Sequence, residues 1–409
     1  MSRSDRNHGK ALVALIVLIV TSACASTSGG PAVEPTAAAG PAWPPPPLEA
    51  RILYTRTLVS EESLDSDTSF GESMFALLTG TPPPKYHVYQ PMDLAVSADG
   101  QRLYVSDFGQ LIVFMFDLEN RTVTTITPGE RAFARPFGIA LDEEENLYVV
   151  EQGSAQITVL DREHNVISSF SDPSLVRPAD IAVDTARGRI YVADPARQHS
   201  EVHNVKVFDT AGNLVDTVGK GRGTCAGCLL FPTYVEVDGD GQLFVTNTLN
   251  ARIDIFDANG EYVRLVGERG NGFGMFDKPK GVAVDSFGNT YVVDSGWSNV
   301  QIFNDAGEVL LFFGGRGSGP GYMHNPTGIA IGPQNRIYVA DFLNNRVVAY
   351  QLVNTNATDS FLDPNATEQE NDGDQERTVT GENDSRQESA TTKQSSDQRS
   401  TTSSQGAQR

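Results

Sequence analysis

The chain has 409 residues, a formal net charge of −21, 38 glycines and 22 prolines. This charge argues against nucleic acid or an anionic membrane surface as a partner, because both are polyanions. Short runs of Val, Ile, Tyr and Phe between turn residues predict an all-β protein, and no long stretch has the apolar spacing of an amphipathic helix.

The N-terminus has the pattern of an export signal. Three basic residues precede the apolar run "ALVALIVLIV", which is too short to span a bilayer comfortably. The run ends in "TSACAS", which resembles a bacterial lipobox. This resemblance implies that residues 1–23 are a signal peptide and that Cys24 is lipidated, which anchors an exported protein to a membrane of the cell envelope. The absence of an Asp after Cys24 favours the outer membrane, and ordinary cleavage after Ala25 is the alternative.

The next segments lead into the main domain. Residues 24–50 are rich in Pro and Ala and predict an extended tether. The strand-like run "RILYTRTLV" follows at 51–59. We expect residues 60–90 to be a long connection over one face, either a lid or a packing flap.

A repeated pattern occupies most of the remaining chain. Each copy begins with Pro, two further residues and an alternating apolar strand, followed by a second strand that ends in a polar residue and by a third strand. The anchoring prolines are Pro91, Pro136, Pro178, Pro232, Pro279 and Pro326. Five copies have a fourth strand after a turn such as "DTAGN" or "DANGE".

Six such copies predict a six-bladed β-propeller of four-stranded antiparallel blades over residues 51–353. The sixth copy stops after its third strand. We expect the N-terminal run at 51–59 to supply its outer strand, because this closes the ring without a free edge.

The run "NPTGIAIGPQNRIYVADFLNNRVVAY" at 325–350 resembles the NHL-repeat family. The match covers Pro, Gly, the Y-V-x-D strand end, and an Asn and Arg before the last strand. Among its members the chain looks most like the lipoprotein-type six-bladed propellers of bacterial envelopes. The resemblance implies the fold with high specificity and the function with low specificity, since such propellers include protein-binding, RNA-binding and lyase members.

The third residue of each proline anchor should lie at the mouth of the central channel. It is Gly in three blades and Asp93, Asp180 and Tyr234 in the others. These three side chains are candidates for ligand contact, and capping of backbone N–H groups is the alternative for the two Asp residues. The acids that end the second strands belong to the repeat, so we expect them to close turns. They are Asp107, Glu151, Asp194, Asp294 and Asp341.

Arg222, Arg269 and Arg316 lie in glycine-rich connections between blades. No helix follows these connections, so they are not phosphate loops. The three arginines are candidates for binding a carboxylate-bearing partner on the rim, and solvated or locally paired arginines are the alternative. Trp297 is either an exposed contact on the same rim or part of the packing between blades.

Two loops of the third repeat should be neighbours and bring His199 and His203 toward Cys225 and Cys228. The spacing permits a zinc site. Because exported cysteines usually oxidise, a Cys225–Cys228 disulfide is the preferred interpretation, with no bound metal.

After the repeats, residues 354–409 predict a disordered acidic tail, because the segment is nearly free of apolar residues. We expect the whole protein to be a binding or scaffold module for an envelope protein, peptide or glycan, without a cofactor and without assigned catalytic residues. A metal-dependent lyase or lactonase at the channel mouth is the alternative. Only Asp93 and Asp180 favour it, because no His lies on an innermost strand.

Overall fold

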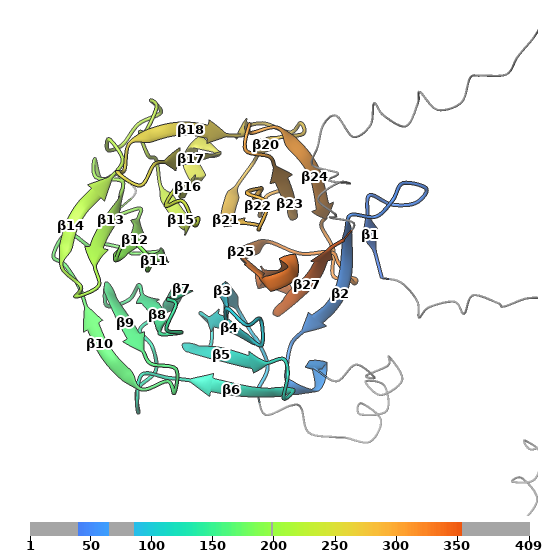
Figure 1. Cartoon of the computed structure of the whole chain (residues 1–409), viewed down its shortest axis with the longest axis horizontal. Helices are drawn as coiled ribbons and strands as arrows, with labels where there is room; N and C mark the ends of the chain where they lie inside the picture. The colour runs from blue at the N-terminus through green and yellow to red at the C-terminus, as the bar shows by residue number, and fades with distance from the viewer. Residues whose placement is uncertain (1–39, 65–85, 198, 354–409) are drawn as a thin grey trace, which may run out of the picture. The chain divides into compact units, whose positions relative to one another are not determined.

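The computed structural model describes residues 40–64, 86–197 and 199–353. Their strands form six antiparallel sheets, arranged as blades around a central channel (Figure 1), and one short parallel pair of β19 (Glu268–Arg269) and β20 (Met275–Phe276) in the connection before blade 5. In each blade the strand that follows the proline anchor is innermost. The predicted six-bladed, all-β propeller is therefore confirmed.

The first five blades each have four strands in sequential order. Blade 1 consists of β3 (Pro91–Val96), β4 (Arg102–Asp107), β5 (Ile112–Asp117) and β6 (Thr122–Ile126). Blade 2 consists of β7 (Pro136–Leu141), β8 (Leu147–Glu151), β9 (Gln156–Leu160) and β10 (Val166–Phe170). Blade 3 consists of β11 (Asp180–Asp184), β12 (Arg189–Asp194), β13 (Asn204–Asp209) and β14 (Leu214–Val218). Blade 4 consists of β15 (Pro232–Val237), β16 (Leu243–Asn247), β17 (Arg252–Phe256) and β18 (Tyr262–Val266). Blade 5 consists of β21 (Pro279–Val284), β22 (Thr290–Asp294), β23 (Asn299–Phe303) and β24 (Val309–Gly314).

Blade 6 combines both ends of the domain. Its inner strands are β25 (Pro326–Gly332), β26 (Arg336–Asp341) and β27 (Arg346–Leu352). The N-terminal strand β2 (Ile52–Leu58) lies antiparallel to β27, and β1 (Ala42–Trp43) adds a fifth strand outside β2. β1 falls within the range predicted as tether, and it is held there because Trp43 packs against the rings of Phe313 and Tyr350 at 6.2 and 5.8 Å.

The core lies between neighbouring blades, because each blade buries both faces of its middle strands. Phe313 of blade 5 and Tyr350 of blade 6 are fully buried, with ring centroids 4.8 Å apart. Phe114 of blade 1 and Val347 of blade 6 belong to another such cluster. Burying each large side chain contributes on the order of 2 kcal/mol, so the repeated interfaces hold the ring together.

Helical structure is limited to short turns in the described part of the chain. These are η1 (Glu61–Leu64), η2 (Thr248–Asn250), η3 (Pro333–Asn335) and η4 (Phe342–Asn344). None of the helices in the described residues is long and apolar enough to cross a membrane. The predicted signal peptide, Cys24, most of the 60–90 connection and the acidic tail lie outside the described residues.

The polar residues that end the second strands hold the connections between blades. The Asp107 carboxylate accepts a hydrogen bond from Tyr89 N at 2.7 Å, and Asp341 accepts one from His324 N at 2.7 Å. Both carboxylates are fully buried. The prediction that these repeated acids close turns is confirmed, and the turns they close form one face of the propeller, here called the rim.

Candidate functional site

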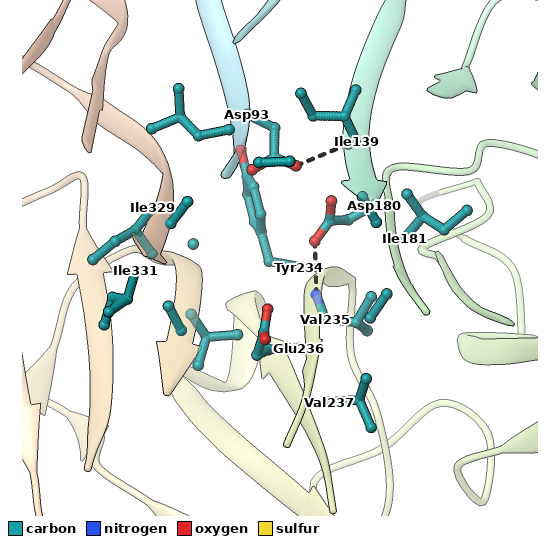
Figure 2. Close-up of a pocket in the computed structure, with 18 of the residues that line it drawn as sticks. Asp93, Ile139, Asp180, Ile181, Tyr234, Val235, Glu236, Val237, Ile329 and Ile331 are labelled. Atoms are coloured by element: carbon teal, nitrogen blue, oxygen red, sulfur yellow. Dashed lines mark hydrogen bonds between the residues drawn. The ribbon is translucent and has the colours of Figure 1, made fainter. Parts of the chain in front are cut away.

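A cavity of about 190 Å³ lies on the propeller axis, lined by the innermost strands (Figure 2). It brings together the predicted residues Asp93, Asp180 and Tyr234. Their exposed fractions are 6%, 3% and 4%, so they lie inside the channel and not on an open rim. Side chains so deeply buried meet only a ligand that enters the channel.

The two aspartates connect neighbouring blades. Asp93 accepts a hydrogen bond from Ile139 N, and Asp180 accepts one from Val235 N, each at 2.9 Å and each across a blade boundary. A β-carbon on Gly138 would collide with the Asp180 carboxylate, so glycine at that anchor makes room for an acid of the next blade. Both Asp residues thus accept from backbone N–H groups as the alternative predicted, but these groups belong to the next blade and are not local.

Both aspartates line the same cavity, and Asp180 Oδ1 is buried there without a hydrogen-bond partner among the described residues. Burial raises the pKa of Asp93 to about 6, although the Ile139 N–H opposes the shift. Burial, followed by the Asp93 carboxyl, raises the pKa of Asp180 well above its usual value. Both carboxyls therefore hold their protons to a higher pH than ordinary aspartates do.

Glu236 is a channel residue that the sequence analysis missed. It lies two positions after Tyr234 on β15, so the two side chains share a face of the strand. Burial, followed by the charge of Asp93, raises the pKa of Glu236 to about 8. Side chains alternate between the two faces of a strand, so counting two residues on from Tyr234 would have predicted that Glu236 lies in the channel.

Tyr234 extends across the channel, where its hydroxyl donates to Met92 O at 3.4 Å. The channel thus holds three carboxyls and a phenol that can take or give protons. In the described part of the chain, no group of three or more His, Cys, Asp or Glu side chains has the arrangement of a metal site.

The three predicted rim arginines occupy equivalent places. Arg269 donates to Leu249 O at 2.9 Å, and Arg316 donates to Gly296 O at 3.5 Å. Arg222 lies 3.5 Å from the Glu201 carboxylate, which is 85% exposed. Each arginine belongs to a separate loop, so the structure does not gather them into one anion site.

Trp297 is 44% exposed and borders a surface pocket of about 350 Å³, here called the blade-5 pocket. Phe273, 76% exposed, and Phe312, 41% exposed, lie in its wall with ring centroids 5.3 Å apart. The remaining lining residues are Asn271, Gly272, Met275, Asn299, Gln301, Gly314 and Gly315. The predicted rim contact at Trp297 is thus one part of a larger aromatic surface.

The predicted loops of blade 3 are neighbours, because Arg222 N donates to Glu201 O at 3.2 Å. Cys225 and Cys228 are joined in a disulfide, with their Cα atoms 5.0 Å apart. His203 is buried, and its Nδ1 accepts a hydrogen bond from Phe231 N at 3.2 Å. The bonded sulfurs are not thiolates, so these residues do not form the alternative four-ligand zinc site.

Comparison with known families agrees with this geometry. One model, described as an NHL repeat, matches residues 175–208, and another, described as a 6-bladed beta-propeller, matches residues 224–296 and 288–366. The chain is an NHL-type six-bladed β-propeller. The NHL repeat match falls on blade 3, and the propeller match falls on blades 4 to 6.

Individual relatives of this NHL propeller are distant. Protein brain tumor of Drosophila melanogaster is 27% identical over 143 residues, which are 34% of this chain and 13% of that protein. A gluconolactonase from Xanthomonas campestris has 18% identity and a TM-score of 0.53, covering 78% of this chain and 99% of that chain. A putative gluconolactonase has 14% identity and a TM-score of 0.51, covering 64% of this chain and 89% of that chain. At these identities the structural likeness concerns the fold alone.

Proposed function

We propose that this NHL propeller is a binding module of the bacterial cell envelope, and that its rim recognises a protein, peptide or glycan partner. The observation that carries the proposal is the aromatic surface of the blade-5 pocket. Phe273, Trp297 and Phe312 are each more than 40% exposed around one concave site. Exposed apolar surface of this kind marks interaction sites, because water contact with it is unfavourable.

The proposal includes a membrane tether. The export pattern and Cys24 supply a lipid anchor, and the Pro/Ala-rich residues after it hold the propeller away from the bilayer. The outer membrane is the proposed location. A rigid propeller on such a tether presents its rim to other envelope components.

Site-specific photo-crosslinking tests the binding function. A photoreactive phenylalanine analogue replaces Phe273 in the full chain, and a matched probe replaces Val215, which is 54% exposed on β14 of blade 3. We expect a discrete crosslinked species from position 273 and none from position 215. Identical patterns from both positions would show that capture is non-specific and would contradict the proposal.

An enzyme acting in the channel is the second candidate, a lyase or lactonase favoured by the buried Asp93 and Asp180, which line one cavity and have raised pKa values. Groups with raised pKa values in a cavity are suited to general acid–base chemistry. A lactone hydrolysis assay with and without divalent metal distinguishes the candidates. Activity that is lost in Asp93→Asn but kept in the surface variant Glu119→Gln would favour the enzyme, whereas inactivity of the wild type would favour the binding module.

A further inference from the structure

Three connections between blades are built alike. Each contains an arginine that forms a parallel bridge or strand pair with a buried apolar residue further along the same loop. The pairs are Arg222 with Leu229, Arg269 with Phe276, and Arg316 with Met323. They lead into blades 4, 5 and 6, so the three loops can be compared position by position.

In blades 4 and 6 an arginine of the third strand fills the loop. Arg252 donates to the carbonyls of Thr224 and Cys225 at 3.1 and 2.8 Å. Arg346 does the same in blade 6, where it donates to Ser318 O at 2.9 Å and Tyr322 O at 2.7 Å. In both blades the loop carbonyls therefore surround a guanidinium group and accept its hydrogen bonds.

An asparagine two residues earlier assists each arginine. Asn250 Nδ2 donates to Gly223 O at 2.8 Å in blade 4, and Asn344 Nδ2 donates to Gly317 O at 2.9 Å in blade 6. These side chains are the Asn and Arg of the NHL pattern. Both act within their own blade.

Blade 5 lacks this pair. Asn299 is the blade-5 equivalent of Arg252, because each pairs with the last residue of the second strand in its own blade. Trp297, two residues before Asn299, occupies the position of the assisting asparagine. The shorter side chain leaves the blade-5 pocket open. Asn299 Oδ1 is buried there without a hydrogen-bond partner among the described residues. A repeat that gives up internal hydrogen bonds at one position is expected to gain function there.

We propose that the blade-5 pocket binds an arginine side chain presented by a protein partner, which replaces the internal arginine of the neighbouring blades. This inference rests on the proposed binding function and names the chemistry that the rim recognises. The loop carbonyls of Asn271 and Gly272 correspond to those that accept from Arg252, and Asn299 Oδ1 is a further acceptor. Trp297 supplies an aromatic face for the cation.

The surrounding charges permit a cationic ligand. The chain carries a formal net charge of −21, which favours the approach of a basic partner. Arg269 and Arg316 adjoin the loops that line the pocket, and their guanidiniums are directed to Leu249 O and Gly296 O. Asp277 lies against the same glycine, but its carboxylate is already 3.9 Å from Lys278 Nζ, so the oxygens and the aromatic face of the pocket carry the recognition. Met275 O is already bound by Gln301 Nε2 at 2.9 Å, but a carbonyl has a second lone pair.

Nuclear magnetic resonance on the full chain provides the test, because the chain has only two tryptophans. The Trp297 indole N–H reports on the pocket, and the packed Trp43 indole is an internal reference. The probe is a blocked Gly-Gly-Arg-Gly-Gly peptide, compared with the same peptide carrying Gln. We expect a saturable shift at Trp297 alone and about tenfold tighter binding of the Arg peptide, the gain expected from a cation over an aromatic face.

Two variants sharpen the result. Asn299→Arg restores the internal arginine while keeping the Trp297 reporter, so it should abolish the response to the Arg peptide. Phe273→Ala removes an aromatic wall that is 76% exposed, so it should weaken binding without unfolding the chain. Equal binding of the Arg and Gln peptides, or an unchanged response in Asn299→Arg, would overturn the arginine proposal.

The outcome separates this inference from the proposed function. A discrete crosslink from position 273 without selectivity for the Arg peptide would leave a binding module and refute the arginine ligand. Absence of both signals would refute the two proposals together.

Discussion

Replacing Asp93 by Asn tests whether the channel carboxyls hold a proton in the folded protein. Asn has the shape of the protonated acid and can keep the hydrogen bond from Ile139 N by accepting it through Oδ1. The pKa of Asp93 rises from its ordinary 3.8 to about 6 on folding. A carboxyl with a raised folded pKa binds more protons in the native state than in the unfolded state, so stability falls as pH rises between those two values.

The magnitude follows from the shift. About 2 pKa units at ~1.4 kcal/mol each give a penalty of about 3 kcal/mol, which is nearly absent at pH 4 and complete above pH 7. Asp93→Asn should therefore unfold with nearly the wild-type free energy at pH 4 and be more stable by up to about 3 kcal/mol at pH 8. The charge of Asp93 also raises the pKa of Asp180, so removing it lowers the pKa of Asp180. Part of the gain in stability will therefore appear in the titration of Asp180.

Urea denaturation followed by circular dichroism at both pH values measures the difference. Glu119→Gln serves as the control, because it removes an exposed carboxyl and should leave the pH dependence at its wild-type value. An Asp93→Asn variant that is no more stable than the wild type at pH 8 would refute a raised pKa of Asp93 in the folded protein.

Two further substitutions test the packing of the channel and the rim. Gly138→Ala should cost more than about 2 kcal/mol of stability, because its β-carbon would collide with Asp180, whereas Gly239→Ala has open space and should change little. Equal thermal midpoints for the two glycine variants would contradict this packing. Arg346→Met should cost about 3 kcal/mol in urea denaturation, because it leaves a buried carboxylate unpaired, while Lys278→Met breaks an exposed pair and should lie within about 0.5 kcal/mol of the wild type. Similar losses of unfolding free energy in Arg346→Met and Lys278→Met would show that the buried ion pair stabilises the fold no more than the exposed one.

The blades could be predicted from the sequence because the repeat is local. A proline anchor, an alternating strand and a strand-end acid recur in each copy, and each feature determines its own backbone geometry. The strand-end acids were correctly assigned to turn closure for the same reason. The packing of Trp43 against the propeller could not be predicted from a local pattern, because Phe313 and Tyr350 lie far from it in the sequence.

The site was only partly predictable. Asp93, Asp180 and Tyr234 were recognised as departures from glycine at one repeat position, but their burial depends on how closely the six strands approach each other. The blade-5 pocket was missed although its signal is present in the sequence. Trp297 and Asn299 replace the Asn and Arg of adjacent copies, and the meaning of that change required the structures of the filled loops.

Photo-crosslinking from position 273 in the wild type and in Asn299→Arg tests the central claim most directly. Both chains present the same probe on the same exposed loop, and they differ only in whether the blade-5 pocket is filled from within. We predict that the crosslinked partner of the wild type is lost in Asn299→Arg. Capture of the same partner with equal yield by both chains would contradict recognition through this pocket.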